Sequence, residues 1–485
     1  MSAAKTPGSL VAAALAPTGR ETVVVPRTRD GDIPSFAGIR GLSVLVIGMD
    51  YLPAPAPIAP YTTATAEHLA SLGARVTVLT GLPTRPDGRP AAPYRVGLRC
   101  VDPAWSTPEA PRVVRLRHLS ARRRGLPRRP WGQALRELTF LVAAILGSRS
   151  SNADLIVAVT PSPGGAAAAA RLAVRRGVPL VTIVQGTTAT ANRADAPDPA
   201  TRVATALERF ALRHSDEVAV TSEAFLPAVR GAGVVPERIH LLPNWARIRR
   251  ADESRVAARA ALGWPPGRFT VVRTGLLDPG HDLETVVEAA RLLHERGMTR
   301  FGGRDEDGDD GPGPFTAPVD IVLVGDGSRR AALTQQAFGL NGIRFVDPVD
   351  EDVAPLLLAA ADVLLVSRCD TTSTGATPPA DPGQLATYLA AGRPVLAAVP
   401  ASGPVAFELR RTGGAGVRIG PGDPVALAEA LLRMQASPSR RAAMGRAGLR
   451  YARAHLGREA SMRRLELVLD TVVGRTAAGS PAEDC

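Results

Sequence analysis

Three basic residues lie at or just beyond the ends of apolar runs in the second half of the chain. Arg273 comes near the end of FTVVRTG, His281 follows in the polar segment after it, and Arg368 directly follows ADVLLVS. Lys5 is the only lysine, so any cationic contact to a phosphate in the folded core must come from arginine or histidine. These residues are candidates for binding an anion. Surface ion pairs for the arginines and a helix start for the histidine are the structural alternatives.

A glycine-rich turn and a long polar segment accompany them. The turn GDGS closes an apolar run and opens a helical pattern, so backbone N–H groups at Gly325, Asp326 and Gly327 can face a ligand. Segment 367–380 consists of turn residues without periodicity, and it precedes a predicted helix that Gly392 ends. Both segments leave the C-terminal ends of predicted strands, where open α/β sheets bind ligands.

The elements that position these residues form two series of strands alternating with helices. The first series has strands at 42–48, 74–80, 155–159, 179–184 and 217–221. The second has strands at 269–275, 320–327, 343–347, 361–367 and 394–399, and helical segments follow over about 425–473. Alternation of this kind predicts an α/β protein with two tandem Rossmann-like, doubly wound domains, and it puts the ligand crevice at the C-terminal strand ends.

Composition narrows the partners and the compartment. The net charge of +12 comes with an arginine-rich, Ala-, Gly- and Pro-rich composition, and no helix-turn-helix, zinc-finger or RNA-binding signature accompanies it, so we expect no nucleic acid partner. The three cysteines are isolated, which suits a reducing compartment. The longest apolar run, Leu138 to Gly147, is about half a membrane span. We expect a soluble, cytoplasmic protein.

A basic stretch precedes that apolar run. It has no acidic residue before Glu137 and contains Arg112, Arg115, Arg117, Arg122, Arg123, Arg124, Arg128, Arg129 and Arg136. A basic segment beside an amphipathic helix suits an anionic membrane surface that carries a lipid-linked acceptor, and a solvated arm is the alternative. The first reading would make the protein peripheral on the inner face of the membrane.

Six segments occur in the order found in glycosyltransferase family 4, and the sequence resembles its branch that includes colanic-acid and O-antigen biosynthesis enzymes. The segments are VLVIGMDYLP…YTTATAEHLASLGARVTVLTGLP, RIHLLPNW, VLVGDGSRRAAL, LLLAAADVLLV, TYLAAGRPVLA and GGAGVRIGPGDPVALAEAL. The resemblance implies a GT-B fold, in which two Rossmann-like domains face a cleft. The expected parts are a disordered leader at 1–39, an acceptor-side domain at 40–245, a nucleotide-sugar-binding domain at 246–450, a helix at 451–474 that crosses back, and a disordered tail at 475–485.

The sequence departs from the family pattern where relatives place charged groups. Leu276 and Gly280 replace an Asn and a Lys, and Pro382-Gly383-Gln384 replaces Pro-Ser-Lys. Ile183 and Gly186 stand where relatives carry a His and an Asp. Relatives stabilise the leaving diphosphate with basic side chains and helix N-termini, without a bound metal. Arg273 and His281 are therefore the expected catalytic substitutes.

The resemblance implies a glycosyltransferase of the hexosyltransferase type, which moves a sugar from a nucleotide-sugar to a polysaccharide, lipid-linked or small-molecule acceptor with retention of configuration. A catalytically degenerate binding scaffold and a nucleotide-sugar epimerase are the alternatives. No cofactor or metal is expected. The expected substrate-binding residues are Gly275, Gly325, Asp326, Gly327, Arg368, Gln384 and Thr387, while Tyr388 suits helix packing.

Overall fold

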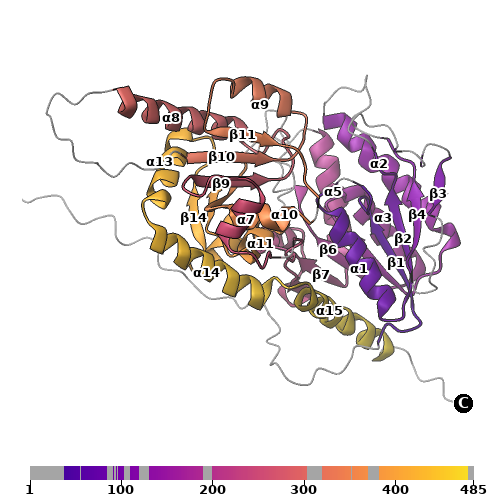
Figure 1. The fold of residues 1–485 in the computed structure, drawn as a ribbon. Helices are drawn as coiled ribbons and strands as arrows, with labels where there is room; N and C mark the ends of the chain where they lie inside the picture. Colours follow the sequence, from indigo (N-terminus) through magenta and orange to yellow (C-terminus); the bar gives the residue numbers. More distant parts are fainter. Residues whose placement is uncertain are drawn as a thin grey trace, which may run out of the picture.

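The computed structural model contains two mostly parallel sheets with helices on both faces (Figure 1). It describes residues 38–478 except 55, 85–90, 92–93, 95–96, 103–109, 120–129, 189–198, 249, 303–318, 351 and 370–381. The polar segment 367–380, most of the basic stretch, the leader and the tail therefore lie largely or wholly outside the described residues.

The first sheet has the strand order β3-β4-β2-β1-β5-β6-β7-β8, and only the β3–β4 pair is antiparallel. Its strands are β1 (Ser43–Gly48), β2 (Arg75–Gly81), β3 (Arg99–Val101), β4 (Arg112–Leu116), β5 (Leu155–Val159), β6 (Leu180–Val184), β7 (Glu217–Val220) and β8 (Ile239–Leu241). The helices are α1 (Ala59–Ser71), α2 (Pro130–Gly147), α3 (Pro163–Arg176), α5 (Pro199–Arg213) and α6 (Leu226–Gly231), with 3₁₀ turns η1 (Ser148–Ser150), η2 (Glu223–Phe225) and η3 (Pro236–Arg238).

The second sheet has the order β11-β10-β9-β12-β13-β14 and is parallel throughout. Its strands are β9 (Phe269–Thr274), β10 (Val319–Val324), β11 (Ile343–Val346), β12 (Val363–Ser367), β13 (Val395–Ala398) and β14 (Gly416–Ile419). The helices are α7 (Arg255–Ala261), α8 (Leu283–Gly302), α9 (Arg330–Gln336), α10 (Ala354–Ala360), α11 (Pro382–Ala390), α12 (Pro404–Arg411), α13 (Pro424–Gln435) and α14 (Pro438–His455).

The last helix, α15 (Arg458–Ala478), packs on the first domain (Figure 1). Its apolar side chains Met462, Leu465, Val468, Leu469 and Val472 join the same buried cluster as the strands β1, β2 and β5. A hydrogen bond between His68 and Glu466 and an ion pair between Arg475 and the buried Glu217 fix its position. Helix α15 thus follows the second domain in the chain and packs against the strands of the first.

The two α/β sheets confirm the predicted fold class, and each predicted strand is present. Four further strands, β3, β4, β8 and β14, were not expected from the sequence, and they are short and lie at or next to sheet edges. Strand β4 changes the interpretation of the basic stretch, because Arg115 points inward and is 1% exposed. Its guanidinium is paired with the Asp102 carboxylate at 2.7 Å. Arg115 is therefore a core residue and not part of a basic surface.

No helix in the described part of the chain combines the length and the apolar character that a membrane span requires.

Candidate active site

The candidate site lies where the strand order of the second sheet reverses. Strands β9, β10 and β11 succeed one another in one direction from β9, and β12, β13 and β14 succeed one another in the other. In doubly wound sheets the crevice at such a reversal, beyond the C-terminal strand ends, is the usual ligand position. Arg273 is the penultimate residue of β9 and Arg368 directly follows β12, so the fold brings two predicted residues to the two sides of the reversal.

Three basic side chains converge at this point. Arg273 is 1% exposed, Arg368 6% and His281 8%. Burial, followed by the charges of Arg368 and Arg273, lowers the pKa of His281 to about 2. His281 is therefore a neutral hydrogen-bonding group between two guanidinium groups, and its Nδ1 has no hydrogen-bond partner among the described residues. A local excess of buried positive charge of this kind favours an anionic ligand.

Helix α11 orders the end of β9 through a buried tyrosine. The hydroxyl of Tyr388 accepts a hydrogen bond from the Thr274 backbone N–H at 2.8 Å and contacts the Thr274 hydroxyl at 3.1 Å. The Gln384 amide donates to the Thr274 carbonyl at 2.5 Å and to the Tyr388 hydroxyl at 3.2 Å. Arg273 donates to the Gly275 carbonyl at 3.0 Å, just beyond the strand. The predicted residues Gln384 and Gly275 thus belong to one network with Arg273, and Tyr388 supports it as well as packing the helix.

The GDGS turn is built against the backbone that follows β9. A Cβ on Gly325 would lie 2.1 Å from the Gly275 carbonyl oxygen, and a Cβ on Gly327 would lie 2.5 Å from the Leu277 carbonyl. Gly325 also has φ +144°, which side chains on L-residues rarely tolerate. Glycine is therefore required here so that two loops can touch.

The same turn corrects one expectation. We expected the N–H groups of Gly325, Asp326 and Gly327 to face a ligand, but those of Gly325 and Gly327 are already bonded within the protein. The Gly325 N–H donates to the Val346 carbonyl, and the Gly327 N–H to the Asp326 carboxylate. The Ser328 N–H and hydroxyl donate to Asp278 at 2.7 and 2.8 Å. The turn positions the loop after β9 and does not offer these donors freely.

Thr387 serves the connection between the domains. Its hydroxyl accepts a hydrogen bond from the Arg247 backbone N–H at 3.2 Å, in the segment that leaves the first domain. Nearby, the Ala246 N–H donates to the Leu456 carbonyl between α14 and α15. Thr387 is thus placed to hold the linker and not within the group around Arg273.

The first domain contributes titratable residues that the sequence analysis missed. Asp50 follows β1, His118 follows β4 and Glu137 lies on α2. Glu137 accepts from the Ser162 hydroxyl at 2.5 Å and the Gly164 N–H at 3.2 Å, and burial raises its pKa. Burial also raises the pKa of Asp50, and burial together with the charge of Arg136 lowers that of His118 to about 4. Asp50 had a usable signal, because it is a charged residue directly after a predicted strand.

Neutral polar groups follow the strands β5, β6 and β8 of the same sheet. The Thr160 hydroxyl accepts from the Gln185 N–H at 2.9 Å and donates to the Gly186 carbonyl. The Asn244 amide donates to the Gln185 side chain at 2.7 Å. Ile183 and Gly186, which replace the family's His and Asp, are therefore a buried strand residue and a backbone acceptor. The two domains thus differ: a basic group in the second, and a mixed polar group in the first.

Comparison with known proteins identifies both halves of the chain. Residues 58–245 match the model of a glycosyl transferase 4-like domain, and residues 315–437 match that of glycosyl transferases group 1. A protein described as a colanic acid biosynthesis glycosyl transferase, WcaI of Escherichia coli K12, is 26% identical over 377 residues, which cover 72% of this chain and 82% of WcaI.

Solved structures show the same fold at low identity. Sucrose-phosphate synthase from Thermosynechococcus elongatus is 18% identical with a TM-score of 0.63, over 90% of this chain and all of that one. HepE of Anabaena, solved with UDP and glucose, is 17% identical with a TM-score of 0.59, over 89% of this chain and all of that one. The two matched domains and the relationship to WcaI show that the chain belongs to the family 4 type of glycosyltransferases, and the solved structures show that it has the GT-B fold.

Proposed function

We propose that the protein transfers a hexose from a nucleoside diphosphate sugar to a saccharide acceptor, with the diphosphate bound at Arg273, Arg368 and His281. The convergence of these buried basic groups at the strand reversal carries the proposal. HepE, which shares the fold, was solved with UDP-glucose, so the fold accommodates such a donor in at least one relative.

The chemistry requires stabilisation of the negative charge that develops on the leaving diphosphate. Arg273 and Arg368 supply fixed positive charge, because arginine stays protonated at every physiological pH. His281 supplies a neutral N–H donor, since two neighbouring arginines oppose a further charge on its ring. Transfer with retention, as the resemblance implies, leaves the departing diphosphate on the same face as the acceptor hydroxyl, where it can receive the proton.

The acceptor is proposed to be a growing polysaccharide or lipid-linked saccharide, with the first domain at an anionic membrane surface. The relationship to WcaI supports a polysaccharide acceptor. Helix α2 supports the proposed contact with a membrane, because one of its faces exposes four apolar side chains at helical spacing. These are Leu135, Leu138, Val142 and Leu146, which are 39–50% exposed. The arginine-rich segment Arg122–Arg124 precedes this helix in the sequence. The attraction of each basic residue to an anionic lipid surface contributes about 1 kcal/mol to binding.

The donor part is tested by nucleotide binding and sugar-nucleotide hydrolysis. The wild-type protein is screened against UDP-, GDP-, ADP- and dTDP-sugars, and Arg273→Ala is compared with Arg433→Ala, an exposed arginine on α13. We expect Arg273→Ala to lower turnover by about 10²–10³ and to weaken nucleotide binding, because one electrostatic contact to the leaving group is lost. Arg433→Ala is expected to behave as wild type.

Two outcomes contradict the assignment. If the wild type binds none of these nucleotides, the chain is a non-catalytic scaffold. If it binds them and Arg273→Ala has no effect, the cation is supplied elsewhere, and Arg368→Ala becomes decisive. Introducing lysine by Gly280→Lys into Arg273→Ala is expected to restore part of the activity, since relatives carry their cation there.

A further inference from the structure

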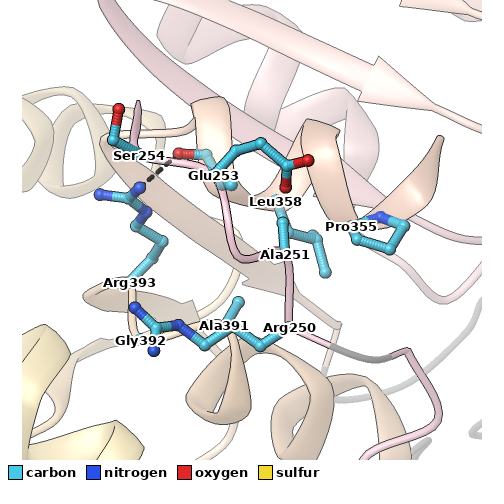
Figure 2. Close-up of a pocket in the computed structure, with 10 residues that line it drawn as sticks. Arg250, Ala251, Glu253, Ser254, Pro355, Leu358, Ala391, Gly392 and Arg393 are labelled. Carbon is cyan, nitrogen blue, oxygen red and sulfur yellow. Dashed lines mark hydrogen bonds between the residues drawn. The ribbon is translucent and has the colours of Figure 1, made fainter. Parts of the chain in front are cut away.

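A cavity lies at the N-terminal ends of the strands of the second sheet, opposite the candidate site at their C-terminal ends. It has a volume of about 120 Å³ and is bordered by the segment before α7, by α10 and by the turn from α11 to β13 (Figure 2). Arg393 comes before β13 begins, whereas Arg368 comes after β12 ends. The cavity is thus one strand length away from the donor crevice, on the order of 15 Å.

The charges around this cavity are not balanced. Arg250 and Arg393 line it, and Glu253 is the one carboxylate among its lining residues. Two further arginines stand behind it and share a single partner: Arg255 and Arg259 both bind Asp362, at 2.9 and 2.6 Å. Asp362 also accepts from the Thr270 N–H, so its oxygens are occupied by other donors. Four arginines therefore face two carboxylates.

Arg393 borders the cavity and has one buried donor without a partner. Its guanidinium donates to the Ala359 carbonyl, and its buried Nε has no hydrogen-bond partner among the described residues. Burial, and then the charge of Arg255, lower the pKa of Arg393. Arg250 approaches Gly392 from the same side, because a Cβ on that glycine would lie 3.9 Å from the Arg250 Nε (Figure 2).

The C-terminal ends of two nearby helices carry partial negative charge, which offsets only part of the positive charge of the arginines. Helices α10 and α11 end beside the cavity, and the C-terminus of a helix carries about half a negative charge. Two such ends amount to about one negative charge, against a net excess of two positive charges on the side chains. The balance stays positive, and it is compensated when an anion binds.

We propose that this cavity binds a phosphate group, as free phosphate or as the head of a phosphomonoester, between Arg250 and Arg393. The cavity has a volume of about 120 Å³, which leaves room for a tetrahedral oxyanion. Guanidinium groups bind phosphate oxygens in bidentate geometry, and Arg250 and Arg393 both line the cavity.

The proposal is tested by isothermal titration calorimetry of the full chain, with inorganic phosphate and with glucose 6-phosphate, at constant ionic strength. Arg250→Gln and Arg393→Gln are expected to weaken binding at least about tenfold through loss of a charge-assisted contact. Glu253→Gln is expected to strengthen it, because the opposing carboxylate is removed, and damage to the fold would not produce a gain. Asp252→Asn and Arg238→Gln are the exposed controls, and neither lines the cavity.

Each outcome decides the assignment. Binding of both ligands identifies a phosphomonoester site, and binding of phosphate alone restricts it to the free ion. Absence of binding to the wild type, or wild-type affinity in Arg250→Gln with no gain in Glu253→Gln, overturns the proposal. Loss of the phosphate signal in Arg273→Gln but not in Arg250→Gln assigns it to the donor crevice instead. Failure of nucleotide binding leaves this result unaffected.

Discussion

Replacing Tyr388 with phenylalanine tests how the donor crevice is held in shape. The substitution keeps the buried ring, which is 0% exposed, and removes only the hydroxyl. The Thr274 N–H at 2.8 Å then loses its acceptor, and the Gln384 amide loses its weaker contact at 3.2 Å. A backbone donor left without a partner costs about 1–3 kcal/mol, and Thr274 is only partly buried, so we expect a loss of about 1–2 kcal/mol in unfolding free energy.

The assay is urea unfolding combined with nucleotide titration, for Tyr388→Phe, Gln384→Ala and the double variant. Because the two side chains share Thr274, we expect a coupling energy of at least about 0.5 kcal/mol, and weaker nucleotide binding from a misplaced Arg273. Strictly additive effects would refute the idea of one network. A loss of stability with unchanged nucleotide affinity would show that the network supports the fold and not the site.

Three further changes have definite expected outcomes. Gly325→Ala should lower unfolding free energy by at least about 2 kcal/mol because of its backbone angle and the contact with Gly275, whereas Gly413→Ala, with φ +66° and no neighbour within 4 Å, should cost about 1 kcal/mol or less in urea unfolding. The pKa of His118 is lowered to about 4, so below pH 6.5 the unfolded chain binds a proton that the folded chain does not, and stability falls as the pH is lowered. Between pH 7 and 5, the wild type should lose about 2 kcal/mol more unfolding free energy than His118→Gln. Parallel curves of unfolding free energy against pH for the two proteins would contradict this. Gln at Leu138 and Val142 together should reduce sedimentation with anionic vesicles several-fold and leave neutral vesicles unaffected; equal binding by wild type and variant would remove α2 from the proposed membrane surface.

Much of the fold follows from local pattern, while the site depends on long-range pairing. Runs such as 155–159 and 361–367 are apolar throughout because both faces of a parallel strand are buried, and that pattern is visible in sequence. Strand β4 is different: its buried Arg115 pairs with Asp102, which directly follows β3 and is brought near by the antiparallel pairing of β3 with β4, and no local pattern shows this.

The same limit applies to the donor crevice. The positions of Arg273 near the end of one strand and of Arg368 directly after another could be predicted, but their meeting depends on β12 pairing with β9 and not with β11. The GDGS turn shows the reverse case, because the composition suggested open N–H groups. Asp278, about fifty residues earlier in the chain, takes up two of the donors of Ser328, and only the folded structure shows it.

The position of α15 has a consequence for how the protein is made. The core of the first domain includes Leu465 and Leu469, yet the rest of that domain is complete by Trp245. A ribosome adds 5–20 residues each second, so the roughly 220 residues between them delay closure of this core by roughly 10–40 s. During that time the strands β1, β2 and β5 exist without the helix that covers them, beside a second domain that can already fold. The first domain is thus the last to be finished, because the apolar surface that α15 covers stays open until that helix has been made.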